Sequence, residues 1–295
     1  MANEIMEING FKVRKSNWGK LLILDYNKIN DSLEFMKKHK ITGIHINYTA
    51  NNNRTLEDVY FLEAFDFLEK VEIIFTSVDD FTGIYKLPNL KSLYLGDITK
   101  KEIDFTKLPN LEECLFQWRN NVKGFFDLRK LKKLTVFKYS NKTLEGFNRF
   151  TTLTELNVFN SFSIASLKGI GGLKISKLNL GLLPKLESLD YIDQLSESLK
   201  EIELDTCKKI KSIEIISKLP NLEIFNAYNC GEIDSINSIR TLKKLKGICV
   251  GFTVLDGDMS PCIGLKNVTF VNKKHYSHTL NEIRTLNGEP LPYST

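Results

Sequence analysis

Apolar residues recur along the chain in a six-residue frame, at its first, fourth and sixth positions. Three such frames, LKEIEL (199–204), LEIFNA (222–227) and LKGICV (245–250), begin 23 residues apart. Apolar residues between the frames repeat as well, at 14, 17 and 20 residues after the frame starts at 199 and 222. A constant period of this length is the signature of a chain built from stacked structural repeats.

The same frame can be followed through most of the chain and predicts one short strand per repeat. Frames begin at residues 18, 41, 68, 90, 111, 131, 153, 175, 199, 222, 245 and 265, so twelve candidate units follow one another in steps of 20 to 27. Side chains alternate along a strand, so positions 4 and 6 should face the core and positions 3, 5 and 7 should face outward. A short helix or 3-10 turn is expected to return the chain to the next strand.

Two frames have a cysteine at the ninth position, Cys207 and Cys230, and the motif LPNL occurs at 87–90, 108–111 and 219–222. A leucine-rich repeat carries Asn or Cys at this ninth position, and the chain resembles such a protein. The resemblance is greatest to the short repeats, about 22 residues long, of bacterial internalins and of a group of phosphatase-regulating proteins. It implies an α/β solenoid, a leucine-rich repeat horseshoe with a parallel β-sheet on the concave side and short helices or 3-10 turns on the convex side.

Both ends of the chain depart from the frame and are interpreted as caps, since an open solenoid otherwise exposes apolar surface and unpaired strand edges. We predict an N-terminal cap at 1–17 with a short strand at 11–16, a solenoid of about twelve units at 18–272, and a C-terminal cap or tail at 273–295 with a helix at 279–286. Further helices are predicted at 32–39 and 58–67, with an inserted loop at 47–54.

Charge and cysteine content limit the class of protein. The 41 basic and 36 acidic residues are interspersed and give a net charge of only +5, which favours solubility over a nucleic-acid partner. The absence of an N-terminal apolar segment typical of secretion, and of any apolar run of about 18 residues, predicts a cytoplasmic protein without a membrane partner. Five unclustered cysteines agree with a reducing compartment. Cys207 and Cys230 should stack on adjacent coils, as two buried thiols or, under oxidation, as a bridge.

The sequence lacks the motifs that would indicate an enzyme. It contains no phosphate loop, HExxH, CxxC pair or GxSxG elbow. Gly169, Gly171 and Gly172 fall in the return segment of one coil, where glycine serves tight turns. His275 and His278 have a spacing compatible with metal ligation but no Cys or carboxylate partner in the expected register, which favours surface histidines of a cap. We therefore expect no catalytic activity, cofactor, metal or small-molecule substrate.

Outward positions of the frame supply the candidate binding site. Apolar and aromatic side chains are expected to form a patch over four consecutive coils, and three carboxylates to lie on one coil further along. These residues are Tyr94, Leu115, Trp118, Phe137 and Phe159 in the patch, Glu201, Glu203 and Asp205 in the acidic strand, and Tyr228 on the next coil. Exposed aromatic patches often mark interaction sites. The alternatives are rings that fold onto the scaffold and carboxylates that form an ordinary solvated face.

These features favour a non-catalytic protein-binding scaffold that grips a protein partner in its concave face. A bacterial immunity protein that neutralises a toxin and a regulatory protein both fit this description. The alternative is a nucleic-acid-binding protein, because residues 1–40 contain eight Lys or Arg against five acids, and Lys266, Lys273, Lys274 and Arg284 follow near the end. The concave face itself is not basic, which makes nucleic acid the less favoured partner.

Overall fold

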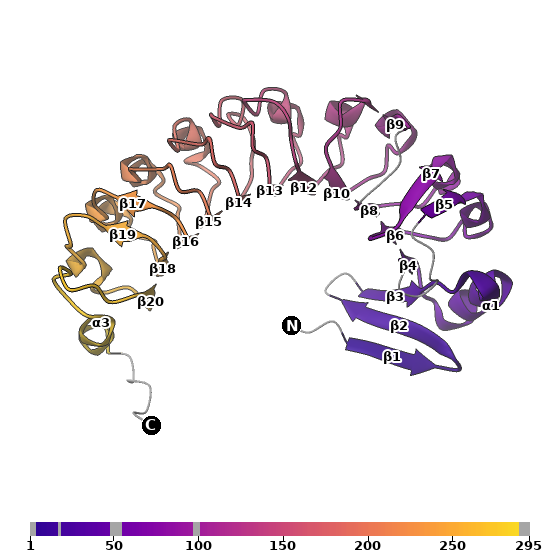
Figure 1. The fold of residues 1–295 in the computed structure, drawn as a ribbon, viewed down its shortest axis with the longest axis horizontal. Coiled ribbons are helices and arrows are strands. Elements are labelled where there is room, and N and C mark those ends of the chain that lie inside the picture. Colours follow the sequence, from indigo (N-terminus) through magenta and orange to yellow (C-terminus); the bar gives the residue numbers. More distant parts are fainter. Residues whose placement is uncertain (1–3, 17–18, 48–54, 97–100, 289–295) are drawn as a thin grey trace. The chain divides into compact units, whose positions relative to one another are not determined.

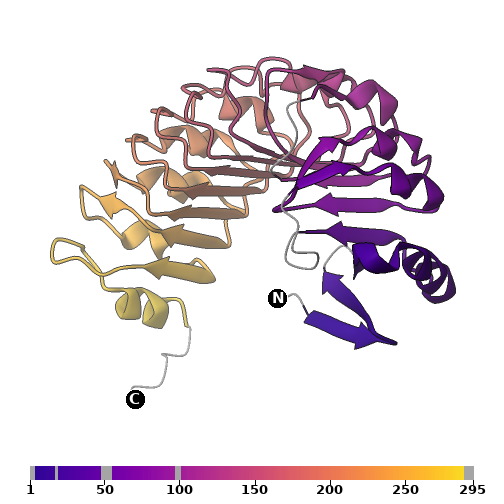
Figure 2. The same cartoon turned by 45° about the vertical axis from the view of Figure 1, so that its right-hand side comes forward.

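A computed structural model describes residues 4–16, 19–47, 55–96 and 101–288 (Figure 1). The chain divides into two compact units, Met1–Leu134 and Thr135–Thr295, which we describe one at a time. In each unit the strands of successive coils lie side by side, and the 3-10 helices lie on the opposite side of the coils (Figure 2). Residues 17 and 18 and all but the first residue of the predicted loop at 47–54 lie outside the described residues.

The first unit contains an antiparallel hairpin followed by parallel strands. Its main sheet runs in the order β1 (Glu4–Ile8), β2 (Phe11–Ser16), β3 (Gly19–Ile23), β4 (Gly43–Ile46), β6 (Lys70–Ile73), β8 (Ser92–Leu95) and β10 (Glu113–Gln117). The return segments contain η1 (Tyr26–Lys28), α1 (Ile29–His39), η2 (Tyr60–Ala64), η3 (Thr82–Lys86), η4 (Phe105–Lys107) and η5 (Phe125–Asp127). Two short parallel pairs lie beside them, β5 (Thr55–Asp58) with β7 (Ser77–Asp80) and β9 (Ile103–Asp104) with β11 (Val122–Lys123).

The second unit is a regular parallel stack. After β12 (Lys133–Phe137), which contains the boundary between the units, its strands are β13 (Glu155–Phe159), β14 (Lys177–Gly181), β15 (Glu201–Asp205), β16 (Ile224–Tyr228), β18 (Gly247–Val250) and β20 (Asn267–Phe270). Its 3-10 helices are η6 (Phe147–Arg149), η7 (Ile192–Leu195), η8 (Glu214–Lys218), η9 (Asn237–Thr241) and η10 (Ser260–Cys262). The short strands β17 (Glu232–Ile233) and β19 (Thr253–Val254) pair, and α3 (Leu280–Leu286) follows the last coil.

Each of the twelve frames contains a strand of the main sheet, which confirms the predicted repeat. The first frame is one residue out of register, because Leu22 rather than Leu21 lies opposite Ile44. Strands β13, β14 and β15 pair without a shift, so equivalent positions lie opposite one another, as Leu156 does to Leu178 and Leu178 to Ile202. These position-4 side chains are at most 1% exposed. A coil by itself leaves its apolar interior open, and only the coils on either side complete the core.

The predictions for the return segments and the N-terminal cap need three corrections. The strand at 11–16 is confirmed as β2, but the sequence analysis missed its partner β1. Helix α1 begins at Ile29, three residues before the predicted start. The segment 58–67 contains only the 3-10 helix Tyr60–Ala64, because β5 occupies its first residue and the turn tightens to 3-10 geometry.

The C-terminal helix is confirmed and its start is capped by its own sequence. The Thr279 hydroxyl accepts a hydrogen bond from the Glu282 backbone N–H, and the Glu282 carboxylate accepts one from the Thr279 N–H. This reciprocal capping box satisfies two of the amide groups that a helix start otherwise leaves without partners. Ile283, on the inner side of this helix, is fully buried, and the helix covers the last coil.

Most 3-10 turns begin with a short polar side chain that the sequence analysis did not single out. Asp104 accepts a hydrogen bond from the Thr106 N–H at 3.0 Å, and Asp258 accepts one from the Ser260 N–H at 2.9 Å. Ser212 accepts from the Glu214 N–H at 3.2 Å. Such bonds hold a turn without requiring a full helix, which explains why short 3-10 segments prevail here.

A buried polar cluster ties the N-terminal hairpin to the coils of the first unit. The guanidinium of Arg14, on β2, donates to the Glu72 carboxylate on β6. His45 Nδ1 lies 2.9 Å from the same carboxylate, and the Asn47 amide lies 2.6 Å from His45 Nε2. Since a carboxylate only accepts and the Asn47 amide nitrogen only donates, the imidazole proton must sit on Nδ1. The Glu72 and His45 side chains are only 5% and 7% exposed.

We expect Glu72→Ala to loosen this cap, because removing one partner of a buried ion pair leaves Arg14 without compensation, at a cost of about 3 kcal/mol. The midpoint of thermal unfolding, followed by circular dichroism, should fall, and limited proteolysis should cut within the hairpin first. Glu69→Ala is the matched control, because Glu69 pairs with Lys91 at 2.6 Å on the surface and exposed pairs contribute little. Equal losses in the two variants would contradict the role of the cluster.

The ninth-position cysteines differ more in burial than the sequence analysis predicted. Both Cys207 and Cys230 are free thiols, and the sequence predicts that both are buried. Cys207 is fully buried, but Cys230 is only half-buried. Burial raises the pKa of Cys207 to about 12. The other buried thiols are Cys114 and Cys262, and burial raises the pKa of Cys262 to about 12 as well. Cys249, at an outward position, is half-buried.

Native alkylation should therefore modify Cys230 and Cys249 before the three buried thiols. The thiolate is the reactive form, and burial raises the pKa of both residues, so their labelling should accelerate as the pH rises above the ordinary thiol range. Glu203 adds to the raised pKa of Cys249, so Glu203→Gln should speed labelling at Cys249 and leave Cys230 unchanged. Mass spectrometry of digests measures both. Rapid labelling of Cys207 would show that the ninth position is not buried.

Candidate functional site

The sheet face, meaning the side of each main sheet that carries frame positions 3, 5 and 7, is the predicted concave face. In the first unit its position-5 residues form one in-register row, which runs His45, Glu72, Tyr94 and Leu115. His45 and Glu72 were expected to be open surface, but they are only 6% and 4% exposed because the polar cluster covers them. Tyr94 and Leu115 lie side by side and are half-buried, so they are the part of the predicted patch that this unit presents.

Trp118 does not belong to that row. Its ring packs against Phe116, Phe125 and Phe126, with ring centroids 6.0, 5.4 and 6.4 Å apart. Phe116 and Phe125 are core residues, so Trp118 extends the core at the end of its coil. Truncation of Trp118 is therefore expected to disturb this packing as well as any contact with a partner. The eighth position lies beyond the strand, where alternation no longer predicts the direction of a side chain.

The second unit contains the remaining aromatic residues of the predicted patch. Phe137 and Phe159, both at position 7, are half-buried, and their ring centroids are 5.7 Å apart at an interplanar angle of 35°. The next position-7 residue is Gly181, where a Cβ atom would come within 2.6 Å of the Phe159 ring. The ring of Phe159 therefore lies over the backbone of β14, and the two rings form a shelf that spans three strands.

The carboxylates of β15 have different surroundings. Glu201 pairs with Lys177 on β14 at 3.3 Å, and its side chain is 42% exposed. Asp205 accepts from the Thr206 hydroxyl at 2.8 Å and from the Asn229 amide at 3.5 Å. Glu203 has no hydrogen-bond or ion-pair partner among the residues that the structure describes. Of the three carboxylates on β15, Glu201 is paired with a lysine, whereas Glu203 and Asp205 have no cationic partner among the described residues.

Tyr228 is the aromatic residue nearest to these carboxylates. It pairs in register with Asp205 and is 38% exposed. Its pKa is raised by partial burial, by Cys249 and by Glu203. Burial is the main cause of the raised pKa of both Tyr228 and Cys249, and the nearby charge of Glu203 adds to it.

A row of amides leads to Glu203 and was not recognised in the sequence, although Asn recurs at position 5. Asn157 donates to the Thr135 hydroxyl and to the Glu155 carboxylate, each at 3.0 Å. Because the Glu155 carboxylate can only accept, this bond fixes the orientation of the Asn157 amide, with its nitrogen toward Glu155. The Asn157 oxygen then accepts from Asn179 at 2.5 Å, and the Asn179 oxygen is buried with no donor.

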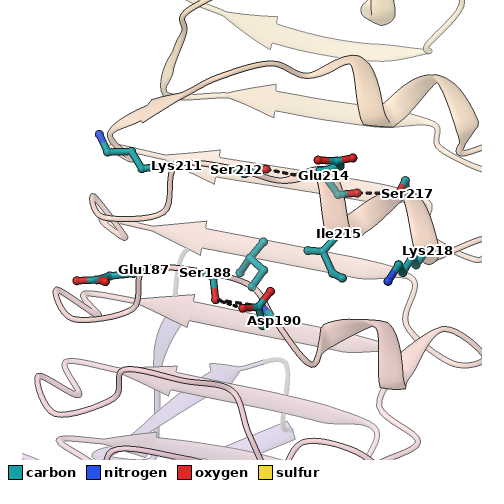
Figure 3. A pocket seen from close by; sticks show the side chains of 10 residues that line it. Glu187, Ser188, Asp190, Lys211, Ser212, Glu214, Ile215, Ser217 and Lys218 are labelled. Atoms are coloured by element: carbon teal, nitrogen blue, oxygen red, sulfur yellow. Dashed lines mark hydrogen bonds between the residues drawn. The ribbon is translucent and has the colours of Figure 1, made fainter.

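A groove in the second unit lies away from the sheet face, beside the turns that precede η7 and η8 (Figure 3). Its volume is about 430 Å³. Ser188 donates to Asp190, Ser212 accepts from the Glu214 N–H, and Ser217 donates to the Glu214 carbonyl. These hydrogen bonds hold the turns together.

Two searches of the described part of the chain bear on other sites. In residues 4–16, 19–47, 55–96 and 101–288, no three His, Cys, Asp or Glu side chains are grouped so that they could hold a metal ion. Within those ranges, no helix combines the length and apolar character needed to cross a membrane. His275 lies 2.9 Å from the Val254 carbonyl and His278 lies 2.9 Å from the Ser277 hydroxyl, so both histidines have structural contacts.

Comparison with known proteins identifies the fold. No protein-family model and no curated protein matches the sequence. An internalin from Listeria monocytogenes superposes with a TM-score of 0.51 at 15% identity, over 79% of this chain and 73% of its own. The TLR13–ssRNA13 complex matches with a TM-score of 0.51 at 15% identity, over 77% of this chain and 39% of its own. Both likenesses concern the fold alone, and with the observed repeat they show that the chain has the leucine-rich repeat fold.

Proposed function

We propose that this chain is a non-catalytic scaffold that holds a protein partner against its sheet face. The observation that carries the proposal is the aromatic shelf of Phe137 and Phe159. Both rings are half-buried on the sheet face. The neighbouring inward positions are occupied by Val136 and Val158, which are fully buried in the core. Aromatic side chains held on a rigid sheet are frequent hot spots of protein interfaces.

The rest of the sheet face of the second unit supports a protein partner over a nucleic acid. The face presents Glu203 and Asp205, and carboxylates repel phosphate. The alternative remains a nucleic acid bound by the basic terminal segments, where Lys266, Lys273 and Lys274 are exposed. Binding that falls steeply as salt concentration rises would favour that alternative.

Within the proposal, the partner is a toxin that the chain neutralises or an enzyme that it regulates, in the cytoplasm of a bacterium. Either would be held by the same surface. The genes next to the one that encodes this chain distinguish the two roles, because a toxin and its antidote are encoded together.

Phe137→Ala and Phe159→Ala should each weaken partner binding while the fold is kept. Truncation of a buried interface aromatic costs about 2 kcal/mol, roughly thirtyfold in affinity. Affinity capture from native lysate with the full chain, read by mass spectrometry, should recover a protein that either variant loses. Leu255→Ala is the matched control, because Leu255 is an equally apolar side chain, 48% exposed, that follows β19 away from the main sheet.

Leu156→Ala separates surface from core in the same experiment. Leu156 is fully buried on β13, so its truncation should lower the melting temperature, at a cost of about 2–5 kcal/mol. If the phenylalanine variants lose as much stability as Leu156→Ala, the rings are packing residues. If they are stable and capture the partner at full strength, the proposed surface is wrong.

A further inference from the structure

We infer that the partner presents an arginine, within an extended segment, to the junction of the aromatic shelf and the carboxylates of β15. This inference rests on the proposed function and names the chemistry of the partner at the same surface. It concerns Phe137, Phe159, Glu203, Asp205 and Tyr228, all within the second unit.

The shelf and the carboxylates meet at Gly181. Register places Gly181 between Phe159 on β13 and Asp205 on β15. A Cβ atom at Gly181 would lie 2.6 Å from the Phe159 ring and 3.7 Å from the Asp205 Cβ. An apolar ring and a carboxylate therefore border one another across a position that has no side chain. A single long side chain can lie along the ring and place its charged end on the carboxylate.

The charge at this junction is negative, and no cationic side chain of the described part of the chain pairs with Glu203 or Asp205. Glu203 has no partner among the described residues, and the bonds of Asp205 come from neutral groups. The amide row adds to this charge, because Asn157 and Asn179 are both oriented with their oxygen ends on the side of β15. Asn179 is the registered neighbour of Glu203, so the negative ends of two aligned dipoles approach an unpaired carboxylate.

These surroundings match a guanidinium better than an ammonium group. A guanidinium stacks on an aromatic face, presents five donors in a plane and is weakly hydrated. Phe159 supplies one ring, and Tyr228 supplies a second on the far side of Asp205. Lysine would use the carboxylates but lose the stacking. Phosphate and acidic peptides would be repelled by Glu203 and Asp205.

The spacing also predicts the neighbour of the arginine. Strands β12 and β15 are three strand spacings apart, about 14 Å. An extended segment that crosses the strands advances about 3.3 Å per residue and directs alternate residues to one side. An apolar residue four positions from the arginine, about 13 Å away, would therefore reach Phe137, and one two positions away, about 7 Å, would lie near Phe159.

The test is a selection of random extended peptides displayed on phage against the full chain. We expect the enriched peptides to share an arginine with an apolar residue two or four positions away. In titrations of one such peptide, Arg→Gln in the peptide should weaken binding roughly tenfold or more, the range of a charge-assisted pair. The double variant Glu203→Gln, Asp205→Asn should weaken the original peptide similarly and show no further loss with the Arg→Gln peptide.

The matched control is Glu187→Gln, Asp190→Asn, which changes the net charge equally but at the groove away from the sheet face (Figure 3). It should bind the peptide at full strength. Enriched peptides without a basic residue that are nevertheless lost on Phe159→Ala would overturn this inference and leave the proposed function standing. Enriched peptides that no sheet-face variant affects would overturn both. Arginine replaced by lysine without loss would overturn the stacking on Phe159 and Tyr228.

Discussion

The burial of one coil against the next is the interaction on which the rest of this structure depends. A strand and its 3-10 turn enclose only half of their apolar side chains, and the coils on either side must supply the remainder. In the second unit, Leu156, Leu178 and Ile202 share one buried column because their strands pair without a shift. A slip of register by one residue would turn such a column outward, since the side-chain period of a strand is two.

Stacking leaves two exposed ends, and the chain closes them by different means. At the N-terminal end an antiparallel hairpin occupies the strand edge, and Arg14 reaches Glu72 across the sheet face. At the C-terminal end α3 covers the last coil, and its capping box fixes where the helix begins. Both devices protect apolar surface and backbone edges that would otherwise pair with other chains.

The same stacking frees the sheet face for recognition. Positions 4 and 6 maintain the core, so positions 3, 5 and 7 can differ from coil to coil without loss of the fold. Regular pairing then brings together side chains that are more than twenty residues apart in sequence, as with Phe159, Gly181 and Asp205. The small residue in this row matters as much as the large ones, because it lets the Phe159 ring lie across the backbone next to a carboxylate.

The sequence by itself determined the repeat, the strand in each of the twelve frames and the inward positions of the regular coils, because period and alternation are local properties of each coil. It missed β1 and placed the first frame one residue out of register. It also identified Phe137, Phe159, Glu203, Asp205 and Tyr228 as side chains of the sheet face. Tertiary structure alone decided which of the outward side chains stay accessible. Alternation gives the direction of a side chain but not what covers it, so Arg14 buries His45 and Glu72 from a distant strand, and Trp118, beyond the end of its strand, joins the core. Pairing between coils likewise decided which carboxylates of β15 are neutralised. Lys177 pairs with Glu201. Glu203 is the registered neighbour of Asn179 and has no cationic partner among the described residues.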